Sequence, residues 1–422
     1  MKKREKMKKK EIMQTLIFVL PYIFIEFSNT ILVTIDKSIS NSIGKTAIIV
    51  FTSFVTLNWA INTIQTCISQ AHNIILVRDK KNYKDINTSA MAMIMFFAII
   101  TSILIYCFAY KITYIYELEQ DAREILTVIL KLKAIQLPLV ALGYVPRNNL
   151  KVNEKTKTIF VIVIASSIVN IVGDLISVKY GFNEKGIYIA TILSTCVSSA
   201  LFLILSKFEI GKISIKYIKE LVKYGKDLVF NKIVQRIVNL FYMHVASSFG
   251  TEPYAIHCVC VGASDLLSES IEGYYSGLLI AYSKDIENKN KYLIKKVDKI
   301  EVIGTAFSVI LAFFLVYPTW WMMGRAISWE TCKPFIGLYL TEFVMTVASC
   351  NYRAYLSANK DTKAIRMMAF IGGLCVRVPY AYFVKCFNLG LYGLSLACGI
   401  DRAVRTLYLR LYIRKNYSRG EK

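Results

Sequence analysis

Residues 147–157 read RNNLKVNEKTK, and residues 353–363 read RAYLSANKDTK. The two stretches share Arg, Leu, Asn, Thr and Lys at the same five places, 206 residues apart throughout (353 against 147). Gly186 and Gly393 repeat in the same way with one residue more between them. Each stretch follows the fourth of six apolar segments in its half of the chain. The sequence therefore predicts an internal duplication.

The apolar segments are long enough to cross a membrane. The chain has 422 residues, 55% of them hydrophobic, and a span needs about 20 mostly apolar residues. We place spans at 13–35, 47–71, 87–110, 131–147, 158–178, 186–206, 227–249, 254–281, 300–318, 335–352, 364–384 and 390–412. The predicted fold class is an all-α polytopic membrane protein with twelve transmembrane helices.

Six spans per half is an even number, so both halves enter the membrane from the same side and form a parallel repeat. We expect an N-terminal six-helix lobe at 1–206, a basic amphipathic cytoplasmic linker helix at 207–226 and a C-terminal lobe at 227–422.

The net charge of +23 has an explanation that needs no nucleic acid. Of the 52 Lys and Arg residues, 38 fall on the side of the N-terminus and 11 on the other side, with only Lys232, Arg236 and Arg377 assigned to spans. Such a bias places both termini in the cytoplasm. Scattered cysteines and three histidines without nearby acids give no zinc, redox or catalytic pattern, so we do not expect an enzyme.

Three features together resemble the MATE (multidrug and toxic compound extrusion) family of the flippase-exporter superfamily. The first span runs from Leu20-Pro21 to Ile35-Asp36 and is followed by Gly44. Each half carries the turn Arg-x5-(Gly or Asn)-x2-Thr-Lys, and the seventh span opens with Tyr224-Gly225-Lys226-Asp227.

The resemblance implies a V-shaped pair of lobes that exports an organic substrate in exchange for Na⁺ or H⁺. We expect a monomer in a bacterial inner membrane, with a small amphiphilic substrate and no cofactor beyond the coupling ion. Pro21 interrupts the backbone hydrogen bonds of the first helix and is a candidate hinge; an ordinary kink is the alternative.

A cation site is predicted in the outer half of the first lobe. Asn170 and Asp174 are four residues apart and share a helix face. Asp36 near the end of the first span and Thr191 in the sixth lie at a similar depth. Carboxylate, amide and hydroxyl oxygens suit an alkali cation, and the resemblance implies the same four residues. The acids also suit proton coupling, and Asn170 and Thr191 alone would serve helix packing equally well.

The second half carries intramembrane charges of both signs, which either pair or line a wet cavity. One interpretation is an ion pair between Glu269 and Arg236 or Arg377; the other is a substrate cavity. Glu342 matches an acid that some MATE proteins use in the second lobe, but Gln235 stands where its partner acid is expected. The full candidate set for a cavity or second acid site is Glu26, Gln235, Arg236, Asp265, Glu269, Glu342 and Arg377.

Two functions therefore stay open. The first is cation-coupled export of a small amphiphilic molecule or drug, with no metal beyond Na⁺. The second is a flippase for lipid-linked oligosaccharides, which basic residues such as Lys232, Arg236 and Arg377 would suit. A scaffold without transport is possible if the charges are all structural.

Overall fold

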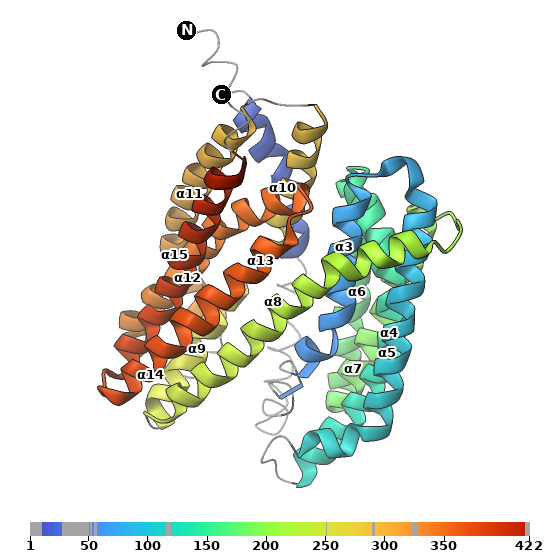
Figure 1. Cartoon of the computed structure of the whole chain (residues 1–422). Coiled ribbons are helices and arrows are strands. Elements are labelled where there is room, and N and C mark those ends of the chain that lie inside the picture. Colours follow the sequence, from blue (N-terminus) through green and yellow to red (C-terminus); the bar gives the residue numbers. More distant parts are fainter. Residues whose placement is uncertain are drawn as a thin grey trace. The chain divides into compact units, whose positions relative to one another are not determined.

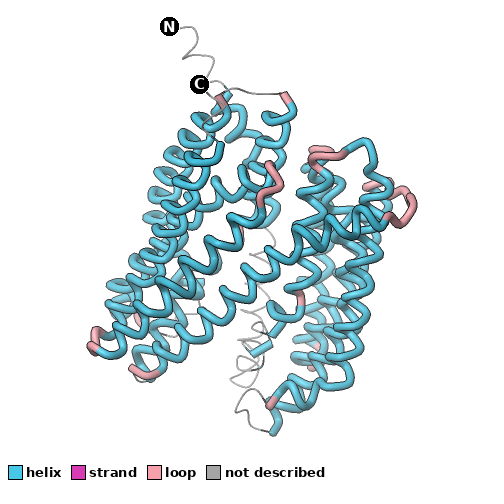
Figure 2. The backbone as a smooth tube through the Cα atoms, in the orientation of Figure 1, coloured by secondary structure: helices cyan, strands magenta, loops and turns pink. Residues whose placement is uncertain are grey.

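The structure is a computed structural model that describes residues 11–27, 50, 53–54, 57–114, 120–249, 251–288, 292–322 and 327–417. The described chain is helical apart from short turns and loops (Figure 2). Six helices in it are long and apolar enough to cross a membrane. The predicted all-α class is confirmed.

The helices follow the predicted spans with some changes in their bounds, and Figure 1 labels them along the chain. The first half contains a helix at 11–27 and then α3 (Thr63–Leu76), η1 (Lys80–Asn82), α4 (Tyr83–Thr113), α5 (Gln120–Val152), α6 (Thr156–Lys179) and α7 (Asn183–Leu205). The second half contains α8 (Ile215–Ser247), α9 (Thr251–Glu269), α10 (Ile271–Glu287), α11 (Leu293–Met322), α12 (Trp329–Ala358), α13 (Thr362–Ala369), η2 (Phe370–Arg377), α14 (Val378–Cys386) and α15 (Gly390–Tyr417).

The repeated turns have the same backbone structure in both halves. Glu154 and Lys360 both have positive φ, 59° and 61°. In each turn the amide three residues after the helix donates back to the shared leucine carbonyl, Lys155 to Leu150 and Asp361 to Leu356, at 2.9 Å in both. This left-handed C-terminal turn ends one helix and starts the next. The duplication read from the sequence is thus confirmed in the backbone.

The chain divides into two compact units, residues 1–27 with 227–422 and residues 28–226. The helix at 11–27 therefore groups with the second half. Gly273 and Gly277 of α10 allow this packing, because a Cβ on Gly273 would lie 2.2 Å from the Tyr22 carbonyl oxygen and one on Gly277 would lie 3.1 Å from Val19. Small residues four apart are a common close contact between membrane helices. The lobe boundaries proposed from sequence stay a prediction.

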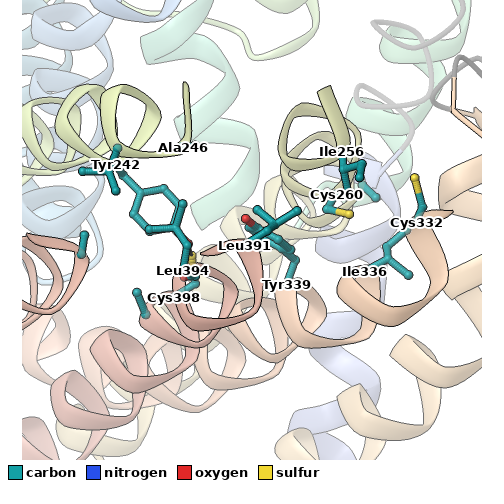
Figure 3. Packing of buried hydrophobic residues seen from close by; sticks show 14 of the residues in the cluster. Tyr242, Ala246, Ile256, Cys260, Cys332, Ile336, Tyr339, Leu391, Leu394 and Cys398 are labelled. Atoms are coloured by element: carbon teal, nitrogen blue, oxygen red, sulfur yellow. Dashed lines mark hydrogen bonds between the residues drawn. The ribbon is translucent and has the colours of Figure 1, made fainter. Parts of the chain in front are cut away.

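Each unit has its own apolar core. In the first half, Leu126, Leu130 and Leu137 of α5 pack with Ile105 of α4 and Tyr188 of α7. In the second half, buried side chains of α8, α9, α12 and α15 meet around Tyr339 (Figure 3). These cores hold the helices whose polar residues form the candidate sites.

Three expected elements differ in the structure. Span 4 was predicted to begin at 131, but α5 begins at Gln120, because Lys133 is buried with a hydrogen-bond partner and Lys131 lies over the Tyr106 ring at 5.7 Å. Span 8 is two helices, α9 and α10, separated at Ser270. The hydroxyl of Ser270 donates to the Leu267 carbonyl at 2.6 Å, a bond that often bends helices.

The linker predicted as a helix at 207–226 is helical only from Ile215 onward. Residues 208–214 are not helical, and α8 runs without a break from Ile215 to Ser247. The backbone amides of Gly211, Lys212 and Ser214 donate instead to side chains in the first two turns of α4, at 2.8, 2.8 and 2.9 Å. These bonds compete with helix formation and keep the segment extended.

Candidate functional site

The predicted cation site is partly assembled in the described residues. Asp174 is fully buried on α6, and the Asn170 amide donates to its Oδ2 at 3.4 Å. A Cβ on Gly173 would lie 2.5 Å from that of Ala190, so α6 and α7 pack tightly one residue before Asp174 and Thr191. The Thr191 hydroxyl donates to the Ile187 carbonyl at 3.1 Å. Asp36 lies outside the described residues.

Sequence reasoning missed a buried lysine in the same unit. Lys133 falls near the start of the predicted span 131–147, but it lies in the middle of α5 and is 4% exposed. Its Nζ donates to Gln136 Oε1 at 3.0 Å, and the Gln136 amide donates to Thr195 Oγ1 of α7 at 2.8 Å. Thr195 in turn donates to the Thr191 carbonyl at 2.8 Å. A hydrogen-bonded chain thus connects an ammonium group with the helix of the predicted cation site.

The second half carries a charged cluster on α12, η2 and α15, which we call the arginine cluster. It consists of Glu342, Arg377, Asp401, Arg402 and Arg405. Both Nε and Nη2 of Arg402 donate to Glu342 Oε1, at 3.2 and 3.0 Å. Arg405 binds Asp401 through two bonds of 2.6 and 2.9 Å. Three guanidinium groups therefore face two carboxylates.

Arg377 lies between the two acids of the arginine cluster. Its Nη1 is 3.4 Å from Glu342 and 3.8 Å from Asp401. Its guanidinium stacks over the Tyr242 ring at 4.4 Å, and its Nη2 donates to the Cys398 sulfur at 3.1 Å. The acids beside Arg377 are thus Glu342 and Asp401, whereas the sequence suggested Glu269, whose side chain lies outside the described residues.

The arginine cluster has unused donors. Nε of Arg377 and Nη1 of Arg405 are buried, and neither has a hydrogen-bond partner among the described residues. The two side chains are 5% and 1% exposed. A guanidinium group has five N–H donors and binds carboxylate or phosphate oxygens. Chemically, the cluster offers surplus positive charge for an anion.

A π-helix positions this cluster. Residues Phe370–Arg377 form η2, and π-helical turns often mark functional sites. A Cβ on Gly372 would lie 2.3 Å from Asp401 Oδ1 and 2.4 Å from Arg405 Nε, so only glycine lets the buried pair approach this backbone. The available sequence signal was the glycine pair Gly372-Gly373, followed four residues later by Arg377 inside the predicted span 364–384.

The two halves place different chemistry at repeat-related positions. Gln136 and Thr195 correspond to Glu342 and Arg402, at spacings of 206 and 207 residues. Both pairs are in contact, the first as a neutral hydrogen bond of 2.8 Å and the second as an ion pair of 3.0 Å. The duplicated contact has thus become charged only in the second half.

The sequence count of span charges was incomplete. Arg402 and Arg405 were counted with the cytoplasmic side although they fall inside the predicted span 390–412. The structure places both within α15, Arg405 at 1% exposure, and Lys133 within α5. Their charge was visible in the sequence, but their burial depends on partners that the sequence does not place.

The remaining predicted residues are less informative. Gln235 on α8 donates to Asn231 at 3.5 Å, and Arg236 is half-buried on the same helix. Glu26 is half-buried near the end of the first helix, and Pro21 is exposed within it. The side chains of Asp265 and Glu269 lie outside the described residues. The hinge role of Pro21 stays a prediction.

Comparison with known proteins gives a family. A family model described as "Polysaccharide biosynthesis protein" matches residues 53–334, more than half of the 422 residues. A search of curated protein sequences found no match.

Solved structures show the fold. One match is a MOP superfamily transporter from Pyrococcus furiosus, with a TM-score of 0.85 at 15% identity, covering 98% of this chain and 97% of that chain. For that protein, the reverse polarity of its binding pocket suggests a different function. An outward-facing multidrug resistance MATE family transporter of the MOP superfamily scores 0.84 at 16% identity, covering 98% and 96%. The Vibrio cholerae MATE transporter VcmN in the bent form scores 0.84 at 13% identity, covering 98% of both chains.

The full-length similarity confirms the expected fold class, an all-α polytopic membrane protein of the MATE type. The expected family is supported only in part, because the matching family model is not a drug-efflux one. The chain therefore belongs to the polysaccharide biosynthesis protein family and is a multi-pass membrane protein with the fold of the MOP superfamily transporters.

Proposed function

We propose that this protein is a flippase that moves an anionic lipid-linked oligosaccharide across the membrane. This is the second of the two functions left open by the sequence, and the family match supports it over drug export. The observation that carries it is the arginine cluster, in which three guanidinium groups share two carboxylates.

The charge of the cluster fits an anionic group better than an organic cation. A hydrogen bond to a charged group contributes about 1.5–3 kcal/mol, and arginine binds phosphate oxygens through two parallel donors. Arg402 is half-buried, and both of its hydrogen bonds go to the same oxygen of Glu342, Oε1. A phosphate of the substrate would take over donors that Glu342 and Asp401 share in the resting protein.

The charge balance of the described residues supports the same proposal. The arginine cluster holds three guanidinium groups and two carboxylates, and Lys133 is buried in the first half.

We retain a coupling role for the first half as part of the proposal. Asp174 would bind Na⁺ or H⁺ together with Asn170, and Asp36 and Thr191 would complete the site. The 3.4 Å contact between Asn170 and fully buried Asp174 supports this assignment. Loss and binding of this ion would bias the protein between its two open states.

The test is a transport assay with the full chain in proteoliposomes. A fluorescent saccharide linked to a polyprenyl pyrophosphate is compared with a fluorescent organic cation, under Na⁺ and H⁺ gradients. The proposal expects the lipid-linked saccharide to cross the bilayer and the organic cation not to be exported. Export of the cation without movement of the saccharide would contradict it and favour the first function.

A further inference from the structure

The first half contains a polar cavity that neither the cation site nor the arginine cluster uses. Its volume is about 230 Å³. It forms where α3, α5 and α7 end and α4 begins, with the segment after α7 as one wall. Its lining residues are Leu76, Lys80, Tyr83, Asn149, Val152, Asn153, Ser206, Lys207 and Glu209.

Two ammonium groups line this cavity. Lys80 and Lys207 form no salt bridge with any described residue. Glu209, the acid in the lining, is already engaged: the Lys84 ammonium contacts its carboxylate, and the Tyr83 hydroxyl donates to it at 2.8 Å. The bond from Lys84 and then that from Tyr83 lower the pKa of Glu209. Glu209 therefore does not neutralise the positive charges of Lys80 and Lys207.

Neutral donors complete the lining. Asn149 is 5% exposed, lines the cavity, and its side chain has no hydrogen-bond partner among the described residues. Asn153 adds a second amide and Ser206 a hydroxyl. Amide N–H groups beside two ammonium groups form a donor-rich site of the kind that binds phosphate oxygens.

The cavity wall is preformed rather than loose. Gly211 lies so close to α4 that a Cβ there would be 2.5 Å from Asp85 Oδ1 and 2.6 Å from the Lys84 carbonyl carbon. Lys207 adopts a left-handed backbone conformation with φ of 50°, and the three amide bonds to α4 hold the segment that follows. A preorganised site loses little entropy when a ligand binds.

The surface beside the cavity is both apolar and basic. Ile210, Ile213 and Ile215 are 82%, 61% and 71% exposed, and Lys212 and Lys216 lie between and beside them. Isoleucines alternating with lysines at the end of membrane spans suit the boundary of an anionic leaflet. Such a surface beside the cavity suits contact with the headgroup of an anionic lipid.

We infer that this cavity is a binding site for a phosphate group, supplied by the headgroup of an anionic phospholipid or by a soluble phosphate ester. Its volume is below the 300–1,000 Å³ of pockets for drug-sized ligands, but a phosphate ester with a small headgroup fits. Lys80 and Lys207 would neutralise the phosphate, and Asn149 would donate to one of its oxygens. The inference does not depend on the proposed transport function.

The experiment uses the purified full chain in neutral detergent, with native mass spectrometry to measure binding of phosphatidylglycerol and of sn-glycerol 3-phosphate. The test variant is Lys80→Gln with Lys207→Asn, since asparagine tolerates the left-handed backbone. The matched control is Lys81→Gln, which removes the neighbouring exposed lysine outside the cavity. Lys80→Gln alone, at an exposed position, is measured in case the double variant unfolds.

We expect the double variant to bind at least one of the two ligands about tenfold more weakly than wild type, and the control to bind like wild type. Weakening for phosphatidylglycerol alone identifies a lipid headgroup as the source; weakening for glycerol 3-phosphate identifies a soluble phosphate ester. Equal binding of both ligands by wild type, the double variant and Lys80→Gln overturns the inference, as does an equal loss in the control.

Discussion

Removing one partner of the buried Asp401–Arg405 pair should destabilise the second half strongly. Arg405→Met deletes two hydrogen bonds, of 2.6 and 2.9 Å, from a carboxylate that is fully buried. Leaving a buried charge without its partner costs about 3–5 kcal/mol. Arg377 Nη1, 3.8 Å from Asp401, can compensate in part, so we expect a loss of about 3 kcal/mol.

The assay is thermal unfolding of the detergent-solubilised full chain, followed by tryptophan fluorescence. For a unit of roughly 200 residues, 1 kcal/mol shifts Tm by about 2–4 °C, so Arg405→Met should lower Tm by about 6–12 °C. The variant Asp401→Leu with Arg405→Met removes both charges and should regain most of the loss, because apolar replacement of a whole buried pair is close to neutral. A shift below about 1 °C for Arg405→Met, or a double variant less stable than the single one, would refute the reasoning.

Two further predictions concern helix packing and coupling. Gly273→Ala places a Cβ 2.2 Å from the Tyr22 carbonyl oxygen and should lower the free energy of unfolding by about 1–3 kcal/mol through overpacking. Gly337→Ala has nothing within 4 Å of its Cβ and should raise the free energy of unfolding by up to about 1 kcal/mol. Equal Tm values for the two variants would contradict this packing. Asp174→Asn should remove the stimulation of transport by Na⁺ and H⁺ gradients in proteoliposomes while leaving the protein folded; full stimulation in that variant would show that coupling lies elsewhere.

The repeat and the fold class were predictable because they depend on local signals. The two eleven-residue stretches at 147–157 and 353–363 share five residues at the same positions, which indicates the duplication. The backbone conformation is repeated as well, with positive φ at Glu154 and Lys360. Apolar length alone indicates spans. Neither inference needs knowledge of which side chains meet.

Charged residues inside helices were harder to place. Lys133 reads as the end of a span, because an isolated lysine is costly in a bilayer; its partner Gln136 and the link to Thr195 on α7 are tertiary contacts. Arg402 and Arg405 read as cytoplasmic for the same reason, although their acids, Glu342 and Asp401, make burial possible.

Backbone departures from a regular helix were not visible either. The π-helix of Phe370–Arg377 and the break at Ser270 have only weak sequence signals, a glycine pair and a serine within apolar runs. The linker was predicted as a helix from its composition, but its amides bond to Thr88, Asp85 and Ser89, three residues more than 120 positions earlier in the chain. Such long-range bonds override local preference.

The central claim, that the arginine cluster receives the anionic group of the substrate, is tested most directly by the charge dependence of transport. Proteoliposomes with wild type, Arg402→Gln or Arg414→Gln are given a saccharide on a pyrophosphate lipid and the same saccharide on an uncharged lipid linker. Arg414 lies on the same helix but is exposed and pairs with Asp298. We predict that wild type and Arg414→Gln move the pyrophosphate form at least tenfold faster than the neutral form and that Arg402→Gln loses most of this preference. Equal rates for both forms in wild type, or an unchanged preference in Arg402→Gln, would contradict the claim.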